Sequence, residues 1–421
     1  MKELDVNQES SRRFDPASFR EVTSLFERHI GQGDVAGAVL SVAVGDEDPC
    51  FISVGETGFG TGRPVQPDSL HRIYSQTKPI TGIATMMLVE EGVIGLDQPI
   101  GELLPELAKL DVLVSEEGDA MRPAKRQPVV RDLLTHSAGF SYGLQFSPLA
   151  ARYRELGLLP GDRISAHRDG GEDPRDLAHM VELLGTLPLA RDPGEMFEYS
   201  LSIDVLGALI ERVSGRGLDA FFEERIFGPL GMADTSFVVP SDKLDRLVNL
   251  HERGEDGTWR LVDDPADSAY ARPALLSGGG GLVSTAQDYA RFTAMLANEG
   301  EYRGKRLLKP ETVRLARSNL LPAGINAQFY GNVMQDVVFG AAMQVNLSAS
   351  RTPPGLYGWG GAAGTGMWVD PIHRLHVVLM TQYFPPEINL TFREDPVAAV
   401  YADLGLWPAG PRAMLHHHLD G

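Results

Sequence analysis

A serine and a lysine lie three residues apart in the stretch from Ile73 to Pro79, a spacing that suits nucleophilic chemistry. In a helix, residues i and i+3 share one face, so Ser75 and Lys78 would lie side by side at the helix N-terminus. There the hydroxyl would have a neighbouring base, and backbone N–H groups would favour the negative charge that develops during attack. Taken alone, the pattern favours the commoner arrangement, a helix-capping serine beside a solvated lysine, so the rest of the chain must decide.

The segment that follows is expected to hold this pair in place. Apolar residues recur at helical spacing until Gly92, which suits the position just after a helix end. Pro79 falls in the first turn, where its missing N–H costs little. The segment is apolar around much of its circumference, which predicts a central, buried helix. The apolar positions are Ile80, Ile83, Ala84, Met87 and Leu88.

Two stretches further along the chain could complete a Ser/Lys site. Tyr199 comes directly before an expected helix over residues 201–213, and its phenol could project into a cleft; the commoner role of such a residue is packing in the core. The stretch 358–366 is rich in small residues, which let a strand edge approach a substrate closely; the alternative is a glycine-rich bend.

Residues 139–143 match Gly-x-Ser-x-Gly, the pattern of the nucleophile elbow in α/β-hydrolases. An elbow needs a strand before its serine and a helix after it. Here a helix-like segment, 131–136, precedes the serine and a loop-like segment, 144–148, follows it. We therefore expect Ser141 to lie in a structural loop, and His136 to satisfy a local hydrogen bond or to pack.

Metal chemistry has little support in the sequence. The chain lacks a His-Glu-x-x-His motif and a pair of cysteines, and His416–His418 form a tract in the terminal tail. Cys50, the single cysteine, lies in a strand-like run and is expected to be a small buried hydrophobe. We therefore expect no metal and no cofactor.

The composition describes an acidic globular protein of 421 residues. It has 57 acidic and 38 basic residues, so its formal net charge is −19, which argues against nucleic acid or an anionic membrane as a partner. There is no run of about 18 apolar residues, so no transmembrane helix is expected. The first residues lack the apolar core of a signal peptide. These features predict a cytoplasmic protein, and they leave its oligomeric state open.

Strand patterns lie near the two ends of the chain, and helix patterns fill the middle. This order predicts one discontinuous sheet domain with terminal helices, residues 15–74 and 276–405. A mostly helical domain, residues 75–275, carries the Ser-x-x-Lys and Tyr motifs, and residues 1–14 and 406–421 are tails. The expected strands are 35–44, 50–54, 365–369 and 375–381; the expected further helices are 15–30, 218–230, 286–299 and 396–404; residues 238–275 are expected to be turn-rich.

Five separated motifs occur together, and with them the chain resembles the serine β-lactamase and penicillin-binding protein superfamily. It is most similar to the family VIII carboxylesterases and their class C β-lactamase relatives. The likeness spans about residues 15–405 and implies an α/β (α+β) β-lactamase-like fold, in which a central antiparallel sheet is flanked by the N- and C-terminal helices and a mostly helical domain is inserted. The motifs are the stretches 70–78, 90–97, 133–139, 193–200 and 279–290.

The resemblance implies a role for each matching residue. Ser75 would be the acylated nucleophile, and Lys78 and Tyr199 would form the proton-transfer system. The backbone N–H groups of Ser75 and Ala362 would form the oxyanion hole. The elbow-like serine would not be used.

Two departures from the pattern of the superfamily bear on the substrate. Trp359, Gly360 and Gly361 stand where β-lactamases have Lys-Thr-Gly, so a cation suited to a substrate carboxylate is missing. The tyrosine motif of the superfamily continues Tyr-x-Asn, but here Leu201 follows Ser200, so an amide is missing as well. We expect Trp359, Gly360, Gly361 and Leu201 to contact the substrate and to favour neutral esters.

The sequence therefore predicts a serine carboxylesterase that hydrolyses short-to-medium acyl esters through an acyl-enzyme on Ser75. Water or an alcohol would accept the acyl group, and the partner would be a small-molecule ester. The alternative is a β-lactamase, a D-Ala-D-Ala carboxypeptidase or a D-aminopeptidase. A third possibility is an inert binding protein on the same fold, against which the intact set of Ser75, Lys78 and Tyr199 argues.

Overall fold

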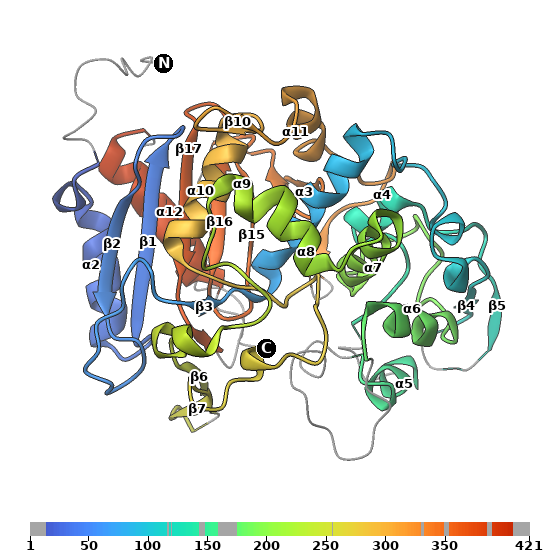
Figure 1. Ribbon diagram of the computed structural model, residues 1–421, viewed down its shortest axis with the longest axis horizontal. Helices are drawn as coiled ribbons and strands as arrows, with labels where there is room; N and C mark the ends of the chain where they lie inside the picture. Colours follow the sequence, from blue (N-terminus) through green and yellow to red (C-terminus); the bar gives the residue numbers. More distant parts are fainter. Residues whose placement is uncertain are drawn as a thin grey trace.

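An antiparallel sheet of seven strands forms one side of the molecule (Figure 1). Its strand order is β13-β14-β15-β16-β17-β1-β2, so strands from the two ends of the chain lie side by side, as the predicted discontinuous sheet requires. The strands are β1 (Gly37–Val44), β2 (Cys50–Gly55), β13 (Val337–Phe339), β14 (Gln344–Asn346), β15 (Tyr357–Gly360), β16 (Gly366–Asp370) and β17 (Leu375–Met380). This computed structural model describes residues 14–115, 118, 120–142, 148–158, 175–254, 256–329, 332–348, 353–384 and 390–406.

Alternating apolar residues explain why both faces of this sheet are covered. Side chains of a strand point to opposite faces in turn. In β1, Leu40 and Val42 belong to the core on the outer face, whereas Val39 belongs to the core on the inner face. In β17, which pairs antiparallel with β1, Leu379 and Val378 divide in the same way. Each face of the sheet therefore carries a hydrophobic core of its own.

Helices from the two ends of the chain, α2 (Arg20–Gly31) and α12 (Leu390–Leu404), pack together over the outer face (Figure 1). The predicted single helix over 15–30 is wrong in one respect, because Asp15 caps a short 3-10 turn and Phe19 separates this turn from α2. Cys50 lies in the outer layer, and burial raises the pKa of its thiol to about 12, which suits a buried hydrophobe.

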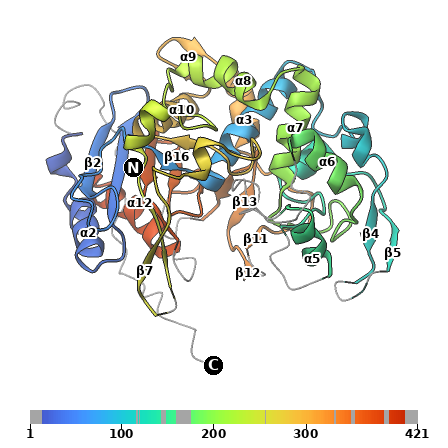
Figure 2. The same ribbon diagram turned by 60° about the horizontal axis from the view of Figure 1, so that its bottom comes forward.

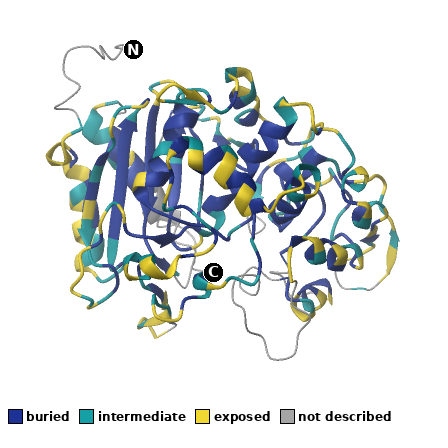
Figure 3. Cartoon of the chain, in the orientation of Figure 1, coloured by how far each residue is buried: buried dark blue, intermediate teal, exposed yellow. Residues whose placement is uncertain are grey.

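The inner face carries α10 (Ala286–Ala297), and α3 (Thr77–Glu90) lies between the sheet and the helical part of the molecule (Figure 1). Every residue from Thr77 to Leu88 is buried, which confirms the prediction of a central buried helix. Figure 3 shows the contrast with α2, which turns exposed residues to solvent on its outer side. The N-terminal end of α3 is therefore fixed by packing from several directions.

The helical part gathers on the other side of α3 (Figure 2). The helix expected at 218–230 is present as α8, a π-helical turn over 223–227, and α9. None of the helices in the described ranges is long and apolar enough to cross a membrane. The remaining elements are α4 (Val130–Leu134), α5 (Pro148–Glu155), α6 (Leu177–Gly185), α7 (Ser202–Ser214), α8 (Leu218–Phe222), α9 (Gly228–Leu230), α11 (Pro310–Ala316), β4 (Asp111–Leu113), β5 (Met121–Pro123), β9 (Glu301–Tyr302), β10 (Lys305–Arg306), β11 (Gln328–Phe329) and β12 (Asn332–Val333).

One hairpin within the range 75–275, which the sequence assigned to the helical domain, packs with the sheet side of the molecule instead. It consists of β6 (Leu250–Arg253) and β7 (Trp259–Asp263), in a segment that was expected only to be turn-rich. β6 pairs in parallel with β18 (Tyr383–Phe384), and the indole N–H of Trp259 donates to the carbonyl of Gly33 at 2.7 Å. The hairpin thus packs with the sheet side of the molecule, although it lies within the range assigned to the helical domain. The domain division stays a prediction.

A short pairing of β3 (His71–Arg72) with β8 (Val283–Ser284) leads into the stretch that carries Ser75. Arg72 is fully buried; its guanidinium pairs with Asp263 and donates to the carbonyl of Val248 at 2.6 Å. A buried charge needs such partners, because its desolvation is costly. These contacts tie the β6–β7 hairpin to the segment before Ser75.

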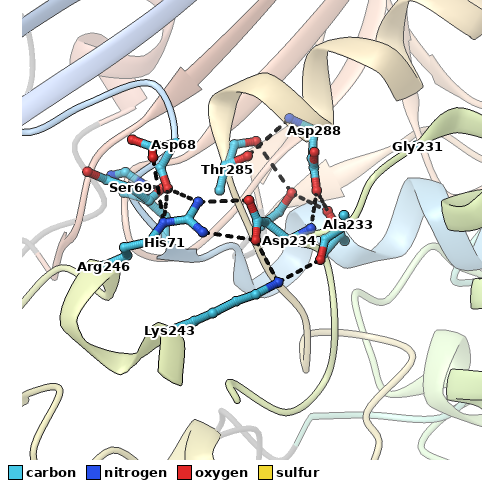
Figure 4. Close-up of polar contacts among 12 residues, drawn as sticks. Asp68, Ser69, His71, Gly231, Ala233, Asp234, Lys243, Arg246, Thr285 and Asp288 are labelled. Carbon is cyan, nitrogen blue, oxygen red and sulfur yellow. Dashed lines mark hydrogen bonds and ion pairs between the residues drawn. The ribbon is translucent and has the colours of Figure 1, made fainter. Parts of the chain in front are cut away.

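Ion pairs hold the loop before β3 from the other side (Figure 4). Arg246 donates to the carbonyl of Asp68 at 2.6 Å and pairs with Asp234, which also pairs with Lys243. Hydrogen bonding to Arg246 lowers the pKa of the Asp234 carboxyl. The buried carboxylate of Asp288 on α10 accepts the backbone N–H of Asp234 at 2.6 Å. This network anchors residues 233–246 between α10 and the entry to β3.

Four histidines of the described residues are buried: His71, His136, His251 and His376. Burial lowers the pKa of His71 and of His376 to about 4, and it lowers the pKa of His136 well below its usual value. His376 is held between the hydroxyl of Thr293, at 2.9 Å, and the carbonyl of Gly45, at 3.1 Å. The folded protein therefore keeps these rings neutral at pH values where an unfolded chain would protonate them.

The free energy of unfolding should consequently fall as the pH drops from about 6.5 toward about 4. Each of these pKa values is lowered on folding, so the stabilisation is complete above the unfolded pKa and is lost as the pH falls. The loss approaches about 1.4 kcal/mol per histidine for each pH unit between the two pKa values. Urea unfolding across this range should show a shallower decline for His376→Gln, which does not titrate. If the free energy of unfolding fell equally with pH in the parent and in His376→Gln, His376 would not contribute to the decline.

Candidate active site

Ser75 lies in a 3-10 turn, Tyr74–Gln76, that runs directly into α3. Tyr74 has a φ of 44°, in the left-handed region that non-glycine residues rarely adopt. Such a conformation costs roughly 1–3 kcal/mol and is typical of functional sites. Lys78 Nζ is 3.1 Å from Ser75 Oγ, so the predicted pairing across three residues is present.

The amine of Lys78 is fully buried among groups that suit a cation. Nζ donates to the carbonyl oxygen of Gly279 at 2.5 Å. It also lies 4.8 Å from the centre of the Tyr199 ring and 5.5 Å from the centre of the Tyr142 ring. Aromatic faces carry negative electrostatic potential and attract an ammonium group. The solvated lysine that the Ser-x-x-Lys pattern first suggested is therefore not what the structure contains.

Tyr199 lies just before α7, as the sequence predicts, and its ring faces the amine of Lys78. Its hydroxyl accepts a hydrogen bond from the indole N–H of Trp359 at 3.2 Å. The structure thus gathers Ser75, Lys78, Tyr199 and Trp359 in one place, although β15 and the α7 entry are 160 positions apart in the chain.

His136 supports the tyrosine segment. Its Nδ1 accepts the backbone N–H of Ser200 at 3.2 Å, so the neutral ring carries its proton on Nε2. The ring lies 4.7 Å from the ring of Tyr199. Both expected roles, a local hydrogen bond and packing, are found. Burial, followed by the charge of Lys78, lowers the pKa of His136, so this ring stays neutral at neutral pH.

Two of the residues expected to contact substrate, Leu201 and Trp359, have buried side chains. Leu201 is fully buried in the larger core, and contact of its side chain with substrate stays a prediction. Trp359 is only 8% exposed and packs in an aromatic cluster with Phe197 and Phe339. Its indole N–H points to the hydroxyl of Tyr199, so Trp359 contacts the tyrosine of the site.

The turn after β15 lies against the entry to Ser75. A Cβ on Gly361 would lie 2.2 Å from the carbonyl oxygen of Ile73, so only glycine fits there. Thr365 donates to the same carbonyl at 3.2 Å. Ala362, next in the chain, is exposed, and among the described residues its N–H donates no backbone hydrogen bond. Its part in an oxyanion hole stays a prediction, as does contact of Gly360 and Gly361 with substrate.

The Gly-x-Ser-x-Gly stretch does not form an elbow in the described residues. α4 and a turn, not a strand, precede Ser141, whose N–H donates to the hydroxyl of Tyr153 at 3.5 Å. The end of the motif, Gly143, lies outside the described residues. His136, which stood near the serine in sequence, is turned toward Ser200.

Two residues at the site were missed by the sequence reasoning. The carbonyl of Gly279 holds Lys78, but a backbone acceptor leaves no mark in a sequence beyond the glycine-rich run around it. Tyr142 meets the Tyr199 ring edge-on, with ring centres 5.3 Å apart, and its only signal was its place inside the elbow-like motif. In the described part of the chain no cluster of three or more His, Cys, Asp or Glu residues could hold a metal ion, and His416–His418 lie outside that part.

Comparisons with known proteins identify the family and the fold of this chain. A family model described as Beta-lactamase matches residues 22–400. Protein Rv1367c of Mycobacterium tuberculosis is 34% identical over 406 residues, covering 91% of this chain and 90% of that protein. Esterase EstB of Burkholderia gladioli is 30% identical over 377 residues, covering 85% of this chain and 88% of its own. The solved structure of EstCE1, a hydrolase with promiscuous acyltransferase activity, has the same fold, with a TM-score of 0.76 and 24% identity over 92% of this chain and 99% of that one.

The hydrogen bond between Trp359 and Tyr199 makes a test possible. Trp359→Phe should keep the aromatic packing but remove the N–H that the Tyr199 hydroxyl accepts. Reaction of Ser75 with a fluorophosphonate, followed by intact mass, should slow by about 10-fold, the effect of losing one hydrogen bond to a charge-developing group. Trp368→Phe is the control, because Trp368 packs in the outer-face core. Equal rates for both variants and the parent would contradict a role for this hydrogen bond.

Proposed function

This chain belongs to the β-lactamase family, and from that premise we propose that it is a carboxylesterase that forms an acyl-enzyme on Ser75. The observation that carries the proposal is the 3.1 Å contact between Lys78 Nζ and Ser75 Oγ, in a site where Tyr199 faces the same amine. A hydroxyl becomes a useful nucleophile only when a neighbouring group can take its proton. The contact supplies that neighbour at hydrogen-bond distance.

In the first step, Ser75 Oγ forms a bond to the ester carbonyl carbon while its proton passes to the Lys78–Tyr199 pair. Negative charge on the carbonyl oxygen is received by the N–H groups of Ser75 and Ala362. The carbon–oxygen bond of the ester then breaks, and the leaving alcohol takes the proton back from the pair.

In the second step, water replaces the alcohol. It gives a proton to the Lys78–Tyr199 pair and attacks the acyl carbon, and Ser75 leaves with that proton restored. An alcohol in place of water would yield a new ester. The burial of Lys78 keeps bulk water away from the amine, so a proton taken from Ser75 stays within the pair until the leaving alcohol receives it.

The surroundings of the site favour a neutral substrate. Tyr142 and Tyr199 line Lys78, and Tyr74 packs edge-on against Tyr270 and Phe384. Trp359 occupies the place where the β-lactamase pattern has a lysine suited to a substrate carboxylate, and it presents an N–H to Tyr199 instead. The name of the Burkholderia relative, an esterase, supports the same substrate class.

A substrate panel tests the proposal. p-Nitrophenyl acetate and butyrate should be turned over well, and nitrocefin and a D-Ala-D-Ala peptide poorly. Ser75→Ala should lower ester turnover by at least about 10³-fold, because removing a nucleophile abolishes the covalent path. Ser141→Ala, the matched control, should retain it. Nitrocefin turnover far above ester turnover would favour a β-lactamase, and absence of all turnover would favour an inert binding protein.

A further inference from the structure

The glycine-rich loop 277–281 is hydrogen-bonded to two helices, α3 and α7, that both contribute to the proposed site. From α3, the hydroxyl of Thr81 donates to the carbonyl of Gly278 at 2.6 Å, and Lys78 donates to the carbonyl of Gly279. From α7, whose entry carries Tyr199, a single side chain reaches the loop through hydrogen bonds, that of Asp204. The loop therefore links the lysine helix to the tyrosine helix.

Asp204 lies in the first turn of α7 and is fully buried. Its Oδ1 accepts the backbone N–H of Gly279 at 3.1 Å and the hydroxyl of Ser277. Gly279 therefore makes both contacts: its N–H donates to the Asp204 carboxylate, and its carbonyl accepts a hydrogen bond from Lys78. Hydrogen bonds to a carboxylate are stronger than those between neutral groups, so this contact orients Gly279 firmly.

Close packing allows the loop little freedom to choose another position. A Cβ on Gly279 would lie 2.5 Å from Asp204 Oδ2, and a Cβ on Gly278 would lie 3.0 Å from the carbonyl oxygen of Ile203. A side chain at Gly279 would collide with the Asp204 carboxylate, and one at Gly278 would lie unusually close to the backbone of α7, so glycine suits both positions.

We propose that Asp204 is a positioning residue for Lys78, acting through the carbonyl of Gly279. The inference rests on the proposed function, because it concerns the same proton-transfer pair. Asp204 holds the N–H of Gly279, and the carbonyl of Gly279 holds the amine of Lys78. Tyr199 lies at the N-terminal end of α7, the same end that carries Asp204. One carboxylate thereby sets where the lysine amine stands between Ser75 and Tyr199. Small errors in such a geometry cost large factors in rate.

Removing the carboxylate should slow acylation without weakening substrate binding. Asp204→Ala should lower kcat for p-nitrophenyl butyrate by about 10- to 100-fold per active site, with KM within about three-fold. Asp204→Asn keeps one acceptor oxygen, so its kcat should fall less than that of Asp204→Ala. Ser277→Ala removes one of the two donors to the carboxylate, so its kcat should also fall less. Active sites are counted by intact mass as the fraction of Ser75 that a fluorophosphonate labels at completion, so misfolded protein lowers this fraction and leaves the rate per site unchanged.

Asp288→Asn is the matched control. Asp288 is a buried carboxylate on α10 that likewise holds a loop N–H and a hydroxyl, those of Asp234 and Thr235. Its variant should keep the parent rate per site. An equal slowing by Asp288→Asn would contradict the inference, as would parent rates in Ser277→Ala and both Asp204 variants. If Asp204→Ala does not fold, the other two variants decide.

The result for the parent protein distinguishes a failure of the positioning role of Asp204 from a failure of the esterase proposal on which it rests. A parent protein without Ser75 labelling or ester turnover overturns the esterase proposal itself. A parent protein that acylates Ser75, with Asp204 variants that acylate at the same rate per site, overturns only the positioning role.

Discussion

The burial of one lysine amine is the constraint on which the rest of this structure depends. Burying an amine is costly unless oxygen atoms and aromatic faces replace its water, and Lys78 contacts the hydroxyl of Ser75, the carbonyl of Gly279 and the ring of Tyr199. These partners come from three separate segments of the chain. Satisfying the amine therefore requires that α3, the entry to α7 and the glycine-rich loop meet at one point.

The sheet and its helices make that meeting possible. α3 is buried along almost its whole length, so its first turn cannot shift without disturbing the core. The turn after β15 lies against Ile73, because Gly361 has no side chain to keep it away. Trp359, in the same strand, sends its indole N–H to Tyr199. The strand edge thereby approaches the serine and the tyrosine together.

Local spacing and a family resemblance carried much of this account from the sequence. The buried helix after Lys78 and the strands near both ends of the chain follow from periodicity, whereas the pairing of Ser75 with Lys78 needed the family resemblance as well. Other features depend on contacts between distant residues: the parallel pairing of β6 with β18, and the carbonyl of Gly279 on Lys78. The burial of Leu201 could not be predicted from the sequence either, because Leu201 precedes α7 with its side chain in the core, whereas the nearby Tyr199 faces Lys78.

The most direct test of the central claim is to trap the covalent intermediate. The protein is mixed with p-nitrophenyl butyrate, quenched with acid during the first turnover, digested, and mapped by mass spectrometry. We predict one butyryl group on the peptide that contains Ser75, and none in the Ser75→Ala variant. A butyryl group on the peptide of Ser141, or turnover of the ester with no acylated serine at any time, would contradict the account.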